Sequence, residues 1–166
     1  MELTRRHIPF RIASGLRFFE QAHVKDVVAF LRLLCNPRDE IAFRRIVGTF
    51  PRVGDATAGK LWQGWLSAAE AWFAAHPDEQ TITAPHSEVM AKVKAPAAAG
   101  LHWKGFLTSM DDLHPTDRQL TPTELVKLAQ NSMNAYMRSA YDNYDERMED
   151  IGQLIQSLAD TPDLDT

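Results

Sequence analysis

The sequence contains a single cysteine, Cys35, so no disulfide can form within the chain. Its first seven residues, MELTRRH, lack the apolar core of a secretory signal. The longest apolar windows, such as residues 27–34, are interrupted by a charge and fall well short of the roughly 20 residues that a membrane-spanning helix needs. We therefore expect a reducing, cytoplasmic location and no membrane partner.

What remains is an ordinary globular composition. The chain has 166 residues, of which 45% are apolar and 24% charged. Both fractions are close to globular averages, so the composition argues against disorder, collagen and coiled-coil rods. A chain of this length suits one domain.

The formal net charge of −4 hides an uneven distribution of charge. Residues 1–60 carry 11 basic and 6 acidic side chains, whereas residues 61–166 carry 7 basic and 16 acidic ones. A polyanion would be drawn to the first third of the chain and repelled by the rest. Solvated surface charge explains the same asymmetry without a partner.

The apolar pattern predicts a mainly α, bundle-like fold with one short N-terminal strand. Residues 8–12 alternate apolar and basic side chains, as in a strand that lacks a neighbour. All later segments have helical spacing, and Thr121 to Glu124 has the form of a capping box. We expect helices at 22–35, 39–47, 56–75, 122–133 and 145–159, a further helix that ends at residues 114–115, and short helical turns within 88–94 and 135–142.

One segment approaches a nucleotide-binding motif but does not complete it. Residues 54–60 match the first seven positions of the P-loop G-x-x-x-x-G-K-[ST]. Leu61 then replaces the hydroxyl side chain that would ligate Mg²⁺, and a helix rather than a buried strand is predicted before the loop. We therefore expect this chain alone to bind no ATP.

No other pattern indicates catalysis or metal binding. The six histidines lack metal-ligand spacing and are interpreted as surface residues, and the acidic pairs are interpreted as solvated helix faces. Cys35 is interpreted as a small buried apolar residue. Core packing is favoured over base stacking for most of the tryptophans, which occur at 62, 65, 72 and 103.

The segment from Pro51 to Lys60 has the features of a phosphate-binding loop. Gly54 precedes a helix whose first turn has small side chains, so its free backbone N–H groups and dipole favour an anion. Basic side chains surround this start, and backbone contacts of this kind hold nucleic acid without reading bases. An ordinary helix start, capped by Asp55 or Thr57, is an equally good interpretation. The predicted nucleic-acid-binding residues are Arg44, Arg45, Arg52, Val53, Gly54, Thr57 and Lys60.

A resemblance to a known family rests on IPFRI at residues 8–12 and GLRFFE at residues 15–20, followed by further matches as far as residue 57. These stretches resemble the segment that leaves motor subdomain 2A and enters accessory subdomain 2B in UvrD/Rep/PcrA-type superfamily-one DNA helicases. Residues 121–125 and 147–154 extend the resemblance in the expected order.

The resemblance implies a fragment of an ATP-driven 3′-to-5′ DNA helicase that acts in repair or replication. The motor motifs are absent here, so ATP and Mg²⁺ would be cofactors of the parent protein, and this chain has no catalytic residues. Subdomain 2B swivels on 2A, and its Arg-Gly-Ile-Gly loop grips the duplex backbone. That loop is represented here by Arg52-Val53-Gly54, one glycine short.

The same resemblance divides the chain into a junction with 2A at residues 1–20, an accessory domain at 21–160 and a frayed tail at 161–166. Arg17, Phe18 and Phe19 would contact the missing motor domains. His23 replaces an acidic residue that is common before Val24.

A different function remains open on the residues alone. The acidic part of the chain after residue 105 could recruit a repair or transcription protein, in which case the Gly54 loop would be only a helix start.

Overall fold

The computed structural model describes residues 20–160, and the predicted strand, the junction residues Arg17, Phe18 and Phe19, and the tail lie outside this part. Within residues 20–160 the fold is entirely helical, which confirms the mainly α prediction. The elements are α2 (Ala22–Cys35), α3 (Glu40–Val47), α4 (Asp55–Ala75), α5 (His86–Val89), the 3₁₀ turn η1 (Ala97–Ala99), α6 (Gly100–Leu113), α7 (Pro122–Ala140) and α8 (Tyr144–Asp160).

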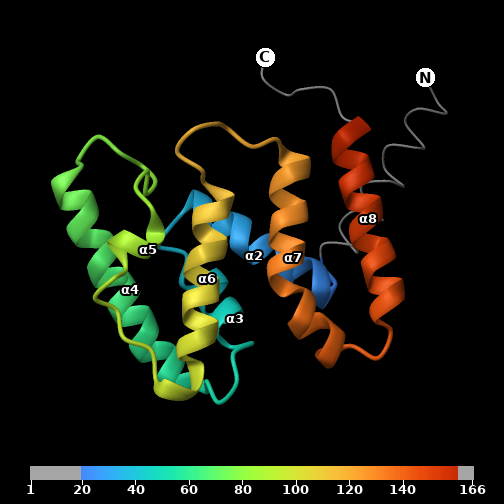
Figure 1. Cartoon of the computed structure of the whole chain (residues 1–166), viewed down its shortest axis with the longest axis horizontal. Coiled ribbons are helices and arrows are strands. Elements are labelled where there is room, and N and C mark those ends of the chain that lie inside the picture. Colours follow the sequence, from blue (N-terminus) through green and yellow to red (C-terminus); the bar gives the residue numbers. More distant parts are fainter. Residues whose placement is uncertain (1–19, 161–166) are drawn as a thin grey trace.

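Helix α2 connects the two halves of the structure (Figure 1). It packs against α3 on one side and α7 on the other. Helices α4, α5 and α6 form one half, and α7 and α8 form the other. Because α2 has neighbours on both sides, its buried residues include Val24, Val27, Phe30 and Leu33.

The core is built on aromatic rings around Phe43 of α3, whose side chain is fully buried. Trp62 and Trp65 of α4 lie with their ring centroids 5.3 Å from that of Phe43. Trp103 and Phe106 of α6 contact it edge-on at 6.1 and 6.2 Å. These contacts fix α3 against α4 and α6, and they confirm that three of the four tryptophans serve the core.

Side chains cap the starts of α3 and α7, and the cap of α7 is the predicted one. The side chain of Asp39 accepts a hydrogen bond from the backbone N–H of Ala42, so α3 begins one residue later than expected. Thr121 and Glu124 form the complete capping box at the start of α7.

Three sequence-based expectations are wrong. Helix α7 continues to Ala140 instead of ending near 133, because buried Met133 and Met137 extend its apolar face by another turn. The turn predicted within 88–94 is α5, which starts at His86 directly after Pro85. Cys35 is exposed, since it lies off the buried face of α2.

His23 and His86 also differ from the surface role predicted for the histidines, because both side chains are buried. His86 lies in the core. Its side chain is 1% exposed and lies parallel to the ring of Trp65 at 6.0 Å. Burial lowers the pKa of His86 to about 4, although nearby Asp111 acts in the opposite direction. The imidazole is therefore a neutral part of the core at pH 7.

Acidification should destabilise the fold through His86. An unfolded histidine titrates near 6.5, so between about pH 6.5 and pH 4 the unfolded state binds a proton that the folded state does not. The free energy of unfolding therefore falls as the pH falls through this window. From pH 7 to pH 5 we expect His86 alone to account for a loss of about 2 kcal/mol.

Urea unfolding at the two pH values measures this loss. The His86→Leu variant should lose about 2 kcal/mol less than the wild type. The His102→Leu variant, which removes an exposed imidazole, is the control and should lose as much as the wild type. Equal losses in all three proteins would contradict the assignment.

Candidate nucleic-acid interface

The chain turns sharply between α3 and α4, in a segment that includes Arg52. The backbone N–H of Val53 donates to the carbonyl of Phe50 at 3.3 Å, and Pro51 and Arg52 occupy the two central positions of this turn. Arg52 has φ of 60°, in the left-handed region, whereas glycine or asparagine is usual at this position of a type II turn. The turn therefore forms without a glycine, at a strain of about 1–2 kcal/mol.

Helix α4 begins with Gly54 as its N-cap, and no side chain caps it. Neither Asp55 nor Thr57 acts as the cap, so the ordinary capped start considered from the sequence is not what the structure contains. The backbone N–H groups of the first turn are therefore free to bind an anion. Asp55 lies exposed in the same turn and adds one negative charge beside them.

Three cationic side chains lie around this helix start. Arg52 and Lys60 are exposed, and neither makes an ion pair with any residue of the described part. Arg44 approaches from α3, with Nη2 only 3.5 Å from the position that a Cβ on Gly59 would take. Its Nε donates to Oε1 of Glu40 at 2.9 Å. We call residues 48–60, together with Arg44, the Arg52 corner.

Arg45 has a different environment from the other predicted nucleic-acid-binding residues. Its Nε donates to Asp26 Oδ1 at 2.8 Å, and its Nη2 donates to the carbonyl of Ala22 at 3.0 Å. The structure thus brings Arg44, Arg52, Val53, Gly54, Thr57 and Lys60 together at one corner and directs Arg45 toward α2 instead. Val53 is half-buried and packs on the core, so it anchors the loop.

Asp26 is the buried centre of a polar network that the sequence analysis missed. Its carboxylate is 3% exposed and accepts hydrogen bonds from Arg45 and from the hydroxyl of Tyr141, both at 2.8 Å. Burial, followed by the hydrogen bond that the hydroxyl donates to Asp26, raises the pKa of Tyr141. The position of Asp26 between Val24 and Val27, on the buried face of α2, is the one sequence signal that could have indicated it.

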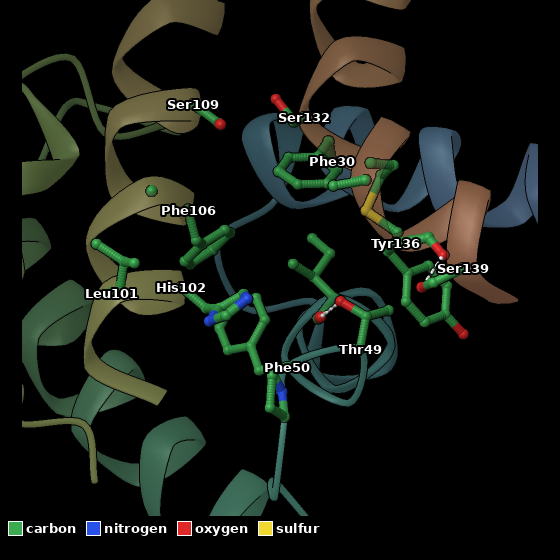
Figure 2. Close-up of a pocket in the computed structure, with 15 residues that line it drawn as sticks. Phe30, Thr49, Phe50, Leu101, His102, Phe106, Ser109, Ser132, Tyr136 and Ser139 are labelled. Atoms are coloured by element: carbon green, nitrogen blue, oxygen red, sulfur yellow. Dashed lines mark hydrogen bonds between the residues drawn. The ribbon is translucent and has the colours of Figure 1, made fainter. Parts of the chain in front are cut away.

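A groove of about 390 Å³ lies between α6 and α7, next to the Arg52 corner (Figure 2). Thr49, Phe50 and Pro51 form part of its wall. No Asp, Glu, Lys or Arg lines it, so the groove is not part of the cationic surface. Phe50 is 9% exposed and packs against His102 and Phe106, so it is not available to stack on an unpaired base.

The near-match to a P-loop has no corresponding structure. Its positions 55–61 are the first two turns of α4, and Leu61 is buried in the core. The segment before it is α3 and a turn, where a P-loop follows a strand. Among residues 20–160, no three His, Cys, Asp or Glu side chains are grouped to hold a metal ion. None of the described helices is long and apolar enough to cross a bilayer.

Comparison with known proteins identifies the family to which this chain belongs. Residues 1–164 match the model of the UvrD-like helicase C-terminal domain, and the chain belongs to this family. It is 32% identical to the ATP-dependent DNA helicase Rep of Escherichia coli (strain K12) over 117 residues. This match covers 68% of this chain and 16% of that helicase.

Shorter matches agree with this assignment. DNA helicase II of Haemophilus influenzae is 48% identical over 56 residues, covering 33% of this chain and 8% of the relative. ATP-dependent DNA helicase UvrD1 of Mycobacterium tuberculosis is 46% identical over 52 residues, covering 31% of this chain and 7% of the relative. The chain thus spans only a small part of the length of these relatives. No solved structure gives a significant match.

Removal of the Asp26 carboxylate should destabilise the fold strongly. The Asp26→Ala variant leaves the hydroxyl of Tyr141 and the guanidinium of Arg45 without their shared acceptor, and Arg45 is only partly able to turn toward water. We expect a loss of about 2–4 kcal/mol in the free energy of unfolding.

Chemical denaturation of a matched variant provides the control. Glu70→Ala breaks a similar two-bond contact with Arg38, but both of these side chains are about half exposed. It should therefore cost far less than Asp26→Ala. If the two substitutions cost the same, the Asp26 network is not a main support of the fold.

Proposed function

We propose that this chain is the accessory domain, of the 2B type, of an ATP-dependent 3′-to-5′ DNA helicase that acts in DNA repair or replication. Family membership supports a helicase parent, and the resemblance of residues 8–57 to the 2A–2B boundary supports the finer assignment. In this proposal residues 1–20 join the motor domains, residues 21–160 form the accessory domain and residues 161–166 are a tail. ATP, Mg²⁺ and a cytoplasmic location belong to the parent protein.

The ligand of the Arg52 corner is the phosphate backbone of duplex DNA. The observation that carries this assignment is the uncapped start of α4, beside which lie Arg52 and Lys60, two cations that form no ion pair within residues 20–160. A helix N-terminus and long basic side chains suit phosphates, which carry no sequence information. Because the one aromatic residue of the corner, Phe50, is buried, single-stranded DNA has no stacking partner there.

Binding should be weak and insensitive to sequence. Contacts of this kind give dissociation constants of about 10⁻⁴ to 10⁻⁶ M at physiological salt. The net charge of −4 and the presence of Asp55 at the site place this chain at the weak end of that range.

The acidic surface of α8 supports a second candidate function, the recruitment of a repair or transcription protein. This function predicts no affinity for duplex DNA.

Loss of Arg52 and Lys60 should abolish most of this binding. Arg52→Ala should weaken binding to every duplex alike and reduce the salt slope by about 0.9, and the double variant Arg52→Ala, Lys60→Ala should reduce it by about 1.8. Fluorescence anisotropy of a labelled duplex across a salt series measures both quantities. Arg52→Gly separates charge from backbone strain, because it keeps the left-handed turn and removes only the side chain.

Lys127→Ala is the matched control. It removes one exposed positive charge from the second turn of α7, outside the Arg52 corner. It should leave the slope unchanged. If the double variant binds duplex DNA as tightly as the wild type, the binding surface does not include Arg52 and Lys60. If the wild type has no affinity for duplex DNA, the protein-recruitment function is favoured.

Neutralisation of Glu40 should strengthen duplex binding. The carboxylate of Glu40 holds Arg44 at 2.9 Å and offsets its charge. Glu40→Gln keeps the length of the side chain but releases the full charge of Arg44 beside α4. We expect a several-fold gain in affinity at low salt that disappears at high salt, because the contact is electrostatic. In the background Arg44→Ala the same substitution should bring a clearly smaller gain, and an equal gain there would show that Arg44 does not face the DNA.

A further inference from the structure

Three side chains join the first turn of α2 to the start of α8. The imidazole of His23 in α2 is 2% exposed and lies between two residues of α8. Nη1 of Arg147 is 2.8 Å from Nδ1 of His23. Oδ2 of Asp150 is 3.3 Å from Nε2 on the other side of the ring.

This arrangement requires a neutral imidazole. A guanidinium only donates hydrogen bonds, so Nδ1 must accept from Arg147 and the ring proton must lie on Nε2, toward Asp150. Protonation would place an N–H at Nδ1 directly against the N–H of Arg147. Two donors and two positive charges would then meet at a distance of 2.8 Å, and the contact would break.

Helix α8 has few other attachments to α2. Ile151 is its one fully buried residue, and its remaining apolar side chains are only partly buried. Its main packing partner is α7, and it lies at the edge of the molecule (Figure 1). Arg147 is itself held in place, because it lies 4.1 Å above the ring of Tyr141 and its Nε donates to Asn143. The contact between α2 and α8 therefore depends on polar groups.

We infer that His23, Arg147 and Asp150 form a latch that fastens α8 to α2 while the imidazole is neutral and releases it when the imidazole is protonated. The charged groups that face His23 are Arg147 and Asp150 from α8 and Asp26 from its own helix, and the edge of Tyr141 lies 6.3 Å away. Glu146 and Glu149 line the polar hollow beside the ring.

The balance of these groups favours the neutral ring. Burial, followed by Arg147, lowers the pKa of His23, and the opposing effects of Asp150 and Asp26 do not restore it. Because α2 is the first and α8 the last helix of residues 20–160, the latch joins the two ends of the described fold. Its release would let α8 pivot on α7 while the Phe43 core stays closed.

Amide hydrogen exchange tests the latch in the full chain. Protection of amides in α8 should fall as the pH is lowered from 7 to 5, by up to about tenfold per pH unit once the pH is below about 6.5. The reference is His23→Asn, whose side-chain oxygen can still accept from Arg147 but cannot be protonated, and which keeps the global effect of His86. The protection of α8 should fall clearly less in this variant than in the wild type.

Two arginine variants complete the test. Arg147→Met should lower the protection of α8 already at pH 7 and reduce its response to pH to that of His23→Asn. Arg138→Met, which removes a second arginine stacked on a tyrosine, Tyr144, at 5.1 Å, should keep the response of the wild type. An equal fall in the wild type and in His23→Asn would overturn the latch.

One measurement needs no variant. Nitrogen NMR of the wild type at pH 7.5 should show Nδ1 of His23 without a proton and Nε2 with one. The opposite tautomer, or a ring protonated at this pH, would also overturn the latch.

Discussion

The inward position of Phe43 is the constraint on which the candidate interface depends. Its ring packs among Trp62, Trp65, Trp103 and Phe106, and it thereby fixes the rotation of the short helix α3. Successive side chains on a helix point about 100° apart, so the two arginines that follow Phe43 must leave α3 on different sides. Arg44 reaches across to α4, and Arg45 reaches back to Asp26 in α2. A pair of adjacent arginines thus serves two purposes, since Arg44 lies against α4 and Arg45 pairs with the buried Asp26.

Sequence reasoning predicted best those features whose cause is local. The capping box at Thr121 and the apolar stripe of α6 depend on residues within a few turns of one another, and the structure contains both. The predicted break between residues 133 and 135 is absent, because the buried Met133 and Met137 continue the apolar face of α7. Burial of Met133 and Met137 depends on neighbouring helices that a local window does not include.

The candidate site also combines features with a local cause and features that depend on distant residues. The helix start at Gly54 and the cations Arg52 and Lys60 lie within a dozen consecutive residues, so their grouping could be predicted from the sequence, whereas the absence of a cap on α4 could not. The ion pair of Arg45 could not be predicted from this stretch, because its partner Asp26 lies 19 positions away. The contact of His23 with Arg147 spans 124 positions, and nothing in the local pattern distinguishes that histidine from one on the surface.

The ion pair of Arg45 with Asp26 limits what the Arg52 corner can do alone. Three cations remain, and one of them, Arg44, is already partly neutralised by Glu40. If each neutralised one phosphate, the salt slope could not exceed about 2.7, which is far below that of a protein with a dedicated DNA site. A grip of this strength fits the weak, sequence-independent contact with duplex DNA that we propose for this corner. The strained left-handed turn at Arg52 fits the same role, since it places a long cation at the tip of the loop, where glycine would supply no charge.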